Sequence, residues 1–343
     1  MPSRGVSAPE ASFGGGAEAA FQRPLVSVIL PAFNAEAFLA QAVQSVVAQS
    51  LTDWEVIIVD DCSLDGTLTL AERLAAADPR IRAIASPKNG GPAAARNRGL
   101  SEARGVWIAL LDADDAFEPD RLSRLVGMAQ DAGADLLADN LLLEDETGHS
   151  EAMLPLSEAA SCAPITSADF LRGNLPDPKR PRKSYGFLKP LIAQQFLEEN
   201  SLCYDEDLRF AEDFAFYLDC FAAKGRFFLC QEPLYRYRLR SDSLTAAHSI
   251  DDLRRLQSVD QRFLEHAGTG RSDDFLPALR EHKRSIDQRL QWRVFIEEIK
   301  SGSWLRALLA SLKGWHVFSY VSTQLLAETW RRLWQGRLGS TPA

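Results

Sequence analysis

Three aspartates stand close together after a short apolar segment. Asp112, Asp114 and Asp115 follow the stretch "WIALL" at residues 107–111. Carboxylates at this spacing repel one another, and the repulsion is costly at the end of a segment with the pattern of a buried strand. Mg²⁺ or Mn²⁺ would relieve it, because hard cations prefer oxygen ligands and magnesium commonly combines one or two carboxylates with phosphates and water. The spacing therefore predicts a diphosphate held through a divalent metal.

The acids that follow this cluster have a simpler interpretation. Glu118 and Asp120 stand where the next helix would begin, and acidic side chains are favoured at a helix N-terminus. A solvated loop whose acids stabilise the next helix is a weaker interpretation for the aspartates at 112–115, because they come at the end of a buried strand. We therefore expect only those three to belong to a binding site.

A second acidic pair, Asp60 and Asp61, ends the apolar stretch "WEVIIVDD". No G-x-G-x-x-G follows the first expected strand and no G-x-x-x-x-G-K-[ST] occurs, so dinucleotide-binding and P-loop sites are unsupported. A carboxylate at a strand end can instead accept hydrogen bonds from a nucleobase or a ribose hydroxyl. The stretch "NGGPAAARNRG" at 89–99 adds glycines and the positive charge of Arg96, which suits phosphate or sugar recognition.

The elements that would carry these residues alternate between strand and helix from residue 25 to about 140. Short apolar segments predict strands at 25–31, 54–60, 81–86 and 107–112. Helices are expected between them at 35–50, 67–78 and 91–104, with Asn34 as the N-cap of the first. This order is typical of βαβ units in a buried parallel sheet, whose ligands bind beyond the carboxyl ends of the strands. We therefore expect the acids to line one crevice.

The composition is that of a soluble globular protein. The chain of 343 residues is 46% hydrophobic and 25% charged, and its net charge of −9 argues against a general nucleic-acid binder. The five cysteines form no C-x-x-C pair, so a reducing, cytoplasmic location fits best. Residues 1–24 lack the apolar core of a signal peptide and are expected to form a flexible tail. No stretch reaches the ~20 uninterrupted apolar residues of a spanning helix.

Together these stretches resemble the GT-A glycosyltransferases of family 2. The matching blocks are residues 26–67, 89–115 and 210–218 ("FAEDFAFYL"), and the resemblance covers about residues 25–245. It implies an α/β GT-A fold with a mostly parallel central sheet flanked by helices. It also implies an enzyme that transfers a sugar from a nucleotide-diphosphate sugar, expected to be UDP-linked, with inversion of the anomeric centre.

The resemblance places the nucleotide at the ends of the first two strands. Pro31, Ala32 and Phe33 would border the nucleotide. Asp61 would contact its base, expected to be uracil, with Asp60 beside it.

The resemblance places the diphosphate and the donor sugar at the end of the fourth strand. Asp112 and Asp114 form the D-x-D pair that would hold the diphosphate through Mg²⁺ or Mn²⁺. Asp115 would sit beside the donor sugar, and Arg96 would lie near the donor pocket.

The resemblance also names a catalytic base in the second half of the chain. The family's base is an acid of an "ED" motif, which is Glu212–Asp213 here, and we expect Asp213 to take this role. The periodicity agrees, because one helix face is apolar and consists of Phe210, Phe214, Tyr217 and Leu218. Without the resemblance, an acid favoured by the helix dipole would be the simpler interpretation.

Two basic stretches are candidates for binding charged groups. The loop "DPKRPRKSYG" at 177–186 carries Lys179, Arg180, Arg182 and Lys183, which suit either an anionic acceptor or lipid surface, or a solvated loop. The stretch "YRYRLRSDSLT" at 235–245 alternates tyrosine with arginine, which predicts a strand. We expect Arg240 and Ser243 to close over the diphosphate.

We divide the chain into a tail (1–24), a GT-A catalytic domain (25–248) and a C-terminal helical region (249–343). Residues 25–140 would be the nucleotide-binding half of the domain and 141–248 the acceptor half.

The helical region has an apolar, aromatic and basic end. This composition fits peripheral contact with the inner face of the cytoplasmic membrane, and the alternatives are a cap over the catalytic domain or a dimer contact. Membrane contact would suit a polyprenyl-diphosphate-linked glycan as the acceptor. The whole chain looks like transferases of bacterial exopolysaccharide assembly of the succinoglycan type.

The stretch "QRLQW" at 288–292 departs from the Q-x-x-R-W of processive relatives at Gln291, which favours addition of one sugar over polymer synthesis. Two other functions remain open from the residues alone. One is a catalytically silent sugar-nucleotide-binding or scaffold protein. Such a protein could lose any of the acids without cost, so the intact set of Asp61, Asp112, Asp114 and Asp213 argues against it. The other is a nucleotidyltransferase, which would be expected to have a basic, glycine-rich loop after the first strand, and "PAFNAEAF" contains none.

Overall fold

The structure is a computed structural model, and the residues it describes are 23–156, 162–180, 183–240, 249–265, 274–311 and 318–325. Most of the expected tail, residues 1–22, lies outside the described residues, as do Arg182 and Ser243 of the two basic stretches.

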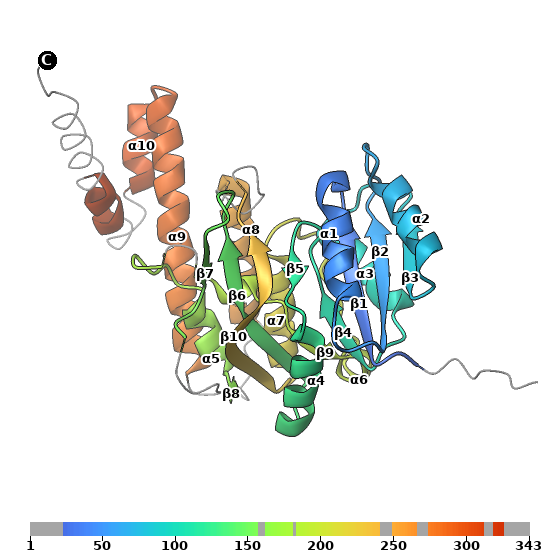
Figure 1. Cartoon of the computed structure of the whole chain (residues 1–343). Helices are drawn as coiled ribbons and strands as arrows, with labels where there is room; N and C mark the ends of the chain where they lie inside the picture. Colours follow the sequence, from blue (N-terminus) through green and yellow to red (C-terminus); the bar gives the residue numbers. More distant parts are fainter. Residues whose placement is uncertain are drawn as a thin grey trace, which may run out of the picture.

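The N-terminal half is a parallel sheet flanked by helices, as its alternating pattern predicts. Its four strands pair in the order β3-β2-β1-β4 and are β1 (Val26–Ala32), β2 (Trp54–Asp60), β3 (Ile81–Ala85) and β4 (Trp107–Leu110). Figure 1 shows its three helices on the two faces of this sheet: α1 (Glu36–Val47) and α2 (Thr67–Ala77) on one, and α3 (Pro92–Glu102) on the other. Every residue of β2 is buried, because helices cover both faces. The expected strands and helices of this half are confirmed.

The start of α1 differs from the expectation. Ala35 takes the N-cap position without a side-chain hydrogen bond, so the prediction that Asn34 caps this helix is wrong. Asn34 adopts φ 49°, and its side-chain oxygen accepts a hydrogen bond from the backbone N–H of Leu64 at 2.8 Å. The asparagine therefore links the loop after β1 to the loop after β2.

The catalytic domain from residue 116 onward, called the second half below, continues the same sheet with mixed pairing, and it begins earlier than the boundary at residue 140 expected from the sequence. Its main strands follow β4 in the order β9-β6-β10-β5 and are β9 (Leu191–Ala193), β6 (Leu136–Glu144), β10 (Phe227–Arg238) and β5 (Ala116–Phe117). The short strands β7 (Ser150–Ala152) and β8 (Cys162–Pro164) pair with β6 and β10. β6 and β10 are parallel, whereas β9 is antiparallel to both β4 and β6. A mostly parallel arrangement therefore describes the N-terminal half, and the sheet as a whole is mixed.

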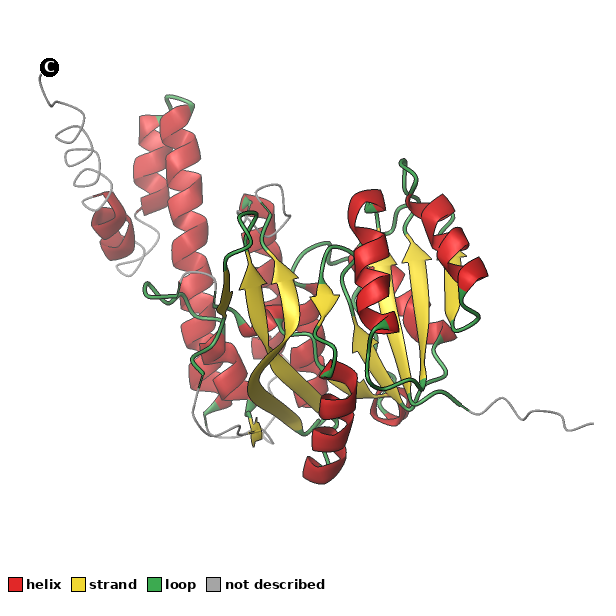
Figure 2. Cartoon of the chain, in the orientation of Figure 1, coloured by secondary structure: helices red, strands yellow, loops and turns green. Residues whose placement is uncertain are grey.

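The helices of this half lie around the added strands (Figure 2). They are α4 (Arg121–Ala132), α5 (Ser167–Gly173), α6 (Gln194–Glu199) and α7 (Glu212–Ala222), with a 3₁₀ turn at Tyr185–Phe187. Asp120 immediately precedes α4, as expected, but makes no side-chain capping bond. Glu118 instead forms an ion pair with Arg236 of β10, so it joins β10 to the segment before α4.

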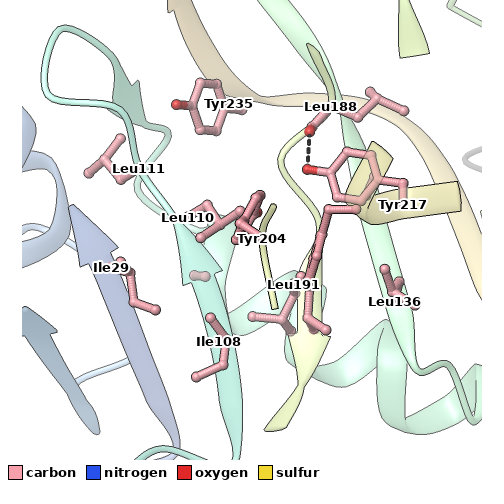
Figure 3. Packing of buried hydrophobic residues seen from close by; sticks show 14 of the residues in the cluster. Ile29, Ile108, Leu110, Leu111, Leu136, Leu188, Leu191, Tyr204, Tyr217 and Tyr235 are labelled. Carbon is pink, nitrogen blue, oxygen red and sulfur yellow. Dashed lines mark hydrogen bonds between the residues drawn. The ribbon is translucent and has the colours of Figure 1, made fainter. Parts of the chain in front are cut away.

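Packing around β9 fixes the segment that precedes it. The hydroxyl of Tyr217, on α7, donates a hydrogen bond to the backbone oxygen of Leu188 at 2.8 Å (Figure 3). The guanidinium of Arg121 donates to the backbone oxygen of Lys189 at 2.5 Å and pairs with Asp139, and the side chains of Arg121 and Asp139 are fully buried. Hydrogen bonds from α7 and from α4 therefore hold residues 188 and 189 in place just before β9, which lies between β4 and β6.

The C-terminal region is helical, as expected, and packs against the second half. It consists of α8 (Ile250–Glu265), α9 (Phe275–Lys300), α10 (Trp304–Ser311) and a helical segment at 318–325. α9 runs past α5 and α8, and α10 lies beside its far end (Figure 1). Arg262 of α8 pairs with Asp219 of α7 at 3.1 Å, which ties this region to the second half. Within the described residues, no helix is both long enough and apolar enough to cross a membrane.

Candidate active site

The carboxyl ends of β1, β2 and β4 open into a cavity of about 990 Å³ that also reaches α7 and the C-terminal helices. The site residues predicted from the sequence line it almost completely. They are Pro31, Ala32, Phe33, Asp61, Arg96, Asp112, Asp114, Asp115, Asp213 and Arg240. Asp60 is the exception: its side chain is buried and does not line the cavity. The parallel register explains the convergence, since Ala32 lies opposite Asp60 and Ile29 opposite Leu110.

The two acids at the end of β2 hold the loops around the cavity. One carboxylate oxygen of Asp60 accepts the backbone N–H of Ser63 at 3.1 Å. Asp61 accepts the N–H groups of Gly90 and Gly91 at 2.9 and 2.7 Å. Gly91 has φ 85°, a conformation that side chains with a Cβ rarely adopt. Asp61 thus shapes the glycine loop that leads into α3, in addition to lining the cavity.

A buried network of charges joins the D-x-D pair to the predicted base. The Nη2 of Arg96 lies 2.9 Å from the Oδ1 of Asp112, and the Nη1 lies 2.7 Å from Glu212. The Nζ of Lys189 lies 3.0 Å from the Oδ2 of Asp112 and 2.7 Å from the Oδ2 of Asp213. The side chains of both cations are only 4% exposed. Asp112 and Asp213 therefore share one ammonium group, although they are far apart in the sequence.

This network sets the charge of its members. Burial alone would raise the pKa of Asp112, but the attraction of Lys189 and Arg96 outweighs it and holds that pKa below its usual range. Burial would likewise lower the pKa of Lys189, but Asp112 and Asp213 raise it. Asp112 is therefore a carboxylate and Lys189 an ammonium at neutral pH.

The other two aspartates of the cluster have different surroundings. Asp115 is buried and accepts hydrogen bonds from the Tyr235 hydroxyl and the backbone N–H of Arg238, both at 2.8 Å. Burial and the charges of Asp112 and Asp114 raise the pKa of Asp115 well above its usual range. The Asp114 side chain is 34% exposed and lies 3.5 Å from Arg240. Burial and the charge of Asp112 also raise the pKa of Asp114.

These surroundings decide which aspartate fits a metal. Burial is the main reason that the pKa values of Asp114 and Asp115 are raised, and the neighbouring carboxylates add to it; a bound cation would favour the charged forms. Asp114 is the member whose carboxylate is open to the cavity, whereas both oxygens of Asp112 already face Arg96 and Lys189. No group of three or more acidic, histidine or cysteine side chains forms a ready-made metal site in the part of the chain that the structure describes. The residues fit a cation that takes Asp114 and completes its shell with phosphate oxygens.

Two residues of the site were missing from the sequence-based set. Lys189 is the only charged residue of the apolar stretch "GFLKPLI", and this isolated charge was the available signal. Tyr235 donates to Asp115, and its hydroxyl oxygen accepts the backbone N–H of Asp112 at 3.1 Å. The alternation over 235–245 predicted a strand there; the observed strand β10 ends at Arg238 and so includes only the first residues of that stretch, and the contact of Tyr235 was not predicted. Of the basic loop, Lys183 lines the cavity.

The comparisons with known proteins agree with this geometry. Residues 27–164 match the family described as glycosyl transferase family 2. The chain is 33% identical to the succinoglycan biosynthesis protein ExoO of Rhizobium meliloti, over 90% of this chain and 87% of that protein. It is 34% identical to the succinoglycan biosynthesis protein ExoU of the same organism, over 79% of this chain and 78% of that protein.

Two solved structures share the fold at low sequence identity. S. aureus TarS 1–349 in complex with UDP-GlcNAc has a TM-score of 0.56 and 18% identity, over 83% of this chain and 90% of that one. The mannosyltransferase PcManGT from Pyrobaculum calidifontis, in complex with GDP-Man and Mn²⁺, has a TM-score of 0.54 and 19% identity, over 92% and 88%. The chain therefore has the GT-A fold, belongs to glycosyltransferase family 2 and is a glycosyltransferase.

Proposed function

We propose that the protein transfers one sugar, with inversion, from a UDP-linked sugar to a glycan or polyprenyl-diphosphate-linked acceptor in exopolysaccharide biosynthesis. The observation that carries the proposal is the single cavity lined by the acids of the β2 and β4 ends and by Asp213 of α7. The names of ExoO and ExoU, both succinoglycan biosynthesis proteins, support the pathway. The UDP-GlcNAc bound by TarS supports a UDP-linked donor.

In this proposal the donor lies along the ends of β1, β2 and β4. Pro31 and Phe33 border the nucleotide, Asp61 contacts the base and Asp60 supports the loop beside it. Asp115 lies beside the donor sugar. Arg96 and Lys189 provide positive charge where the departing diphosphate becomes more negative.

The catalytic step uses Asp213 as the general base. Its carboxylate accepts the proton of the acceptor hydroxyl while that oxygen attacks C1 of the donor sugar and the bond from C1 to the diphosphate breaks. Mg²⁺ or Mn²⁺, when bound, neutralises charge on the diphosphate. Asp114 would hold the metal, and Asp112 would join it by releasing one of its two cations. The Mn²⁺ bound by PcManGT supports a divalent metal.

The donor can be identified by its effect on stability. A ligand at one hundred times its Kd stabilises the folded state by about 2.7 kcal/mol. We expect one UDP-linked sugar, with Mn²⁺, to raise the melting temperature by several degrees in a thermal-shift panel of nucleotide sugars, and EDTA to remove most of the shift. Asp114→Asn should weaken the Mn²⁺-dependent part of the shift. If no nucleotide sugar binds or is turned over, the proposed function is wrong.

Arg240 is the predicted clamp on the diphosphate. It lines the cavity beside Asp114, and a hydrogen bond to a charged group is typically worth about 1.5–3 kcal/mol. We expect Arg240→Gln to raise the donor KM by about tenfold or more. Arg236→Gln is the matched control, because Arg236 pairs with Glu118 and Glu144. An unchanged donor KM in the Arg240 variant would show that Arg240 does not bind the diphosphate of the donor.

We also propose that the C-terminal helices contact the cytoplasmic face of the membrane, where a lipid-linked acceptor would be found. The side chains of Trp304 and Leu305, at the start of α10, are 69% and 71% exposed, and exposed aromatic and aliphatic side chains favour a membrane interface. We expect the full chain to co-sediment with vesicles containing phosphatidylglycerol, and the W304S/L305S variant to do so less. Equal sedimentation of both proteins would contradict this contact.

A further inference from the structure

A buried histidine–aspartate pair connects α8 and α9 outside the predicted set of site residues. The Nδ1 of His282, on α9, lies 3.0 and 2.9 Å from the two carboxylate oxygens of Asp260, on α8. The side chains are 3% and 0% exposed. No residue of this pair takes part in the charge network around Asp112.

The histidine nevertheless reaches the active-site cavity. His282 lines it together with Leu256, Ile286 and Arg289 of the same two helices. Its ring stacks on that of Phe214, with centroids 4.8 Å apart and an interplanar angle of 21°. Phe214 directly follows Asp213 in α7, and His282, Phe214 and Asp213 all line the same cavity.

The contact with Asp260 determines what the imidazole can offer. A carboxylate that faces Nδ1 favours the tautomer with the proton on that nitrogen and fixes the orientation of the ring. Nε2 is then the ring nitrogen left for another partner. Both hydrogen bonds of the ring among the described residues involve Nδ1, and Nε2 is not one of the fully buried atoms that lack a partner, which agrees with the position of His282 at the cavity.

We propose that this wall of the cavity is the acceptor subsite and that the Nε2 of His282 forms a hydrogen bond with a hydroxyl of a saccharide acceptor. Asp260 is the positioning residue that holds the ring for this contact. The acceptor must bring one hydroxyl to Asp213, and Asp213 lines the same cavity as Phe214 and His282. Leu256 and Ile286, both members of the hydrophobic core, make the adjoining part of this wall apolar. The inference rests on the proposed function, and it assigns residues of α8 and α9 to the binding of the acceptor.

Two substitutions distinguish this role from a purely structural link between helices. In H282N the amide nitrogen can replace Nδ1 and keep the bond to Asp260, but nothing replaces Nε2. In H282Q the amide can replace Nε2, but the bond to Asp260 is lost. With octyl β-D-glucopyranoside and octyl β-D-galactopyranoside as acceptor probes, we expect H282N to raise the acceptor KM by about tenfold. H282Q should do so less, and donor hydrolysis and donor KM should stay unchanged in both.

The controls separate the possible failures. Lys283→Gln changes the next residue, which pairs with Asp287 along α9, and should behave like the wild type. D260N should raise the acceptor KM without changing the donor KM. A greater loss in H282Q than in H282N would show that the pair is only a structural link and overturn the proposal. If the wild type turns over no nucleotide sugar, the proposed function fails, whatever the histidine does.

Binding is measured directly on full-length protein labelled with ¹³C-histidine and loaded with UDP and Mn²⁺. The ring signal that H282Q removes should shift when either octyl glycoside is added. Absence of a shift with both glycosides contradicts the acceptor subsite.

Discussion

Replacement of Asp213 by asparagine is expected to reduce transfer by about 10²–10⁴-fold, the usual contribution of a general base, while the donor still binds. An amide has nearly the same shape as the carboxylate but cannot accept the proton of the acceptor hydroxyl. The Asp213 side chain lies at the start of α7, lines the cavity and contacts Lys189 at 2.7 Å. Initial rates of sugar transfer and the Kd of the donor, measured by calorimetry, would separate the two properties.

Asp219→Asn is the matched control for this variant. Asp219 lies on the same helix but pairs with Arg262 of α8, so its replacement should leave the rate close to that of the wild type. Loss of donor binding in the Asp213 variant would assign that residue a structural role. A nearly normal rate would mean that a different group accepts the proton.

Replacement of Lys189 by methionine is expected to lower the free energy of unfolding by about 3–5 kcal/mol and to impair transfer strongly. Removing one partner of a buried ion pair leaves an uncompensated charge, and such changes typically cost this much. Here the carboxylates of Asp112 and Asp213 would both lose the ammonium that they share. Urea unfolding followed by tryptophan fluorescence measures the loss, and Lys300→Met at the exposed end of α9 is the control.

A double substitution tests the physical cause of this loss. In K189M/D213N one of the two unpaired carboxylates is absent, so the double variant should regain part of the stability that K189M loses. Additive losses of the two single variants would show that Lys189 and Asp213 are not coupled, because independent sites add.

The part of the cavity formed by the strand ends was predictable from the sequence because its signals are local. Each strand of the N-terminal half is a short apolar run, and β1, β2 and β4 lead directly into residues that line the cavity. The parallel pairing of β1 with β2 and β4 then brings Asp61 and Asp112 to one edge. Arg96 lines the cavity, but its contact with Glu212 joins residues too far apart in the sequence for a local pattern to show.

The remaining features depend on tertiary contacts that no local pattern carries. β9 has three residues, too few for a periodic signal, and its antiparallel pairing makes the sheet mixed. Lys189 follows a short apolar run just before β9. Its role becomes visible only in the folded structure, where it contacts Asp112 after β4 and Asp213 on α7. The helices of the C-terminal region were expected, but their contact with the cavity through His282 was not. Family membership sets aside the nucleotidyltransferase and the silent scaffold as alternatives.

The position of β9 has a mechanical consequence. This strand hydrogen-bonds to β4 of the nucleotide half and to β6 of the second half, so the two halves share one continuous sheet. A hinge between them would have to break backbone hydrogen bonds beside the anchored Lys189. The separation between the acids at the strand ends and Asp213 is thus set by a stiff framework, and the loops at the rim of the cavity are the elements that can move without breaking the hydrogen bonds of the sheet.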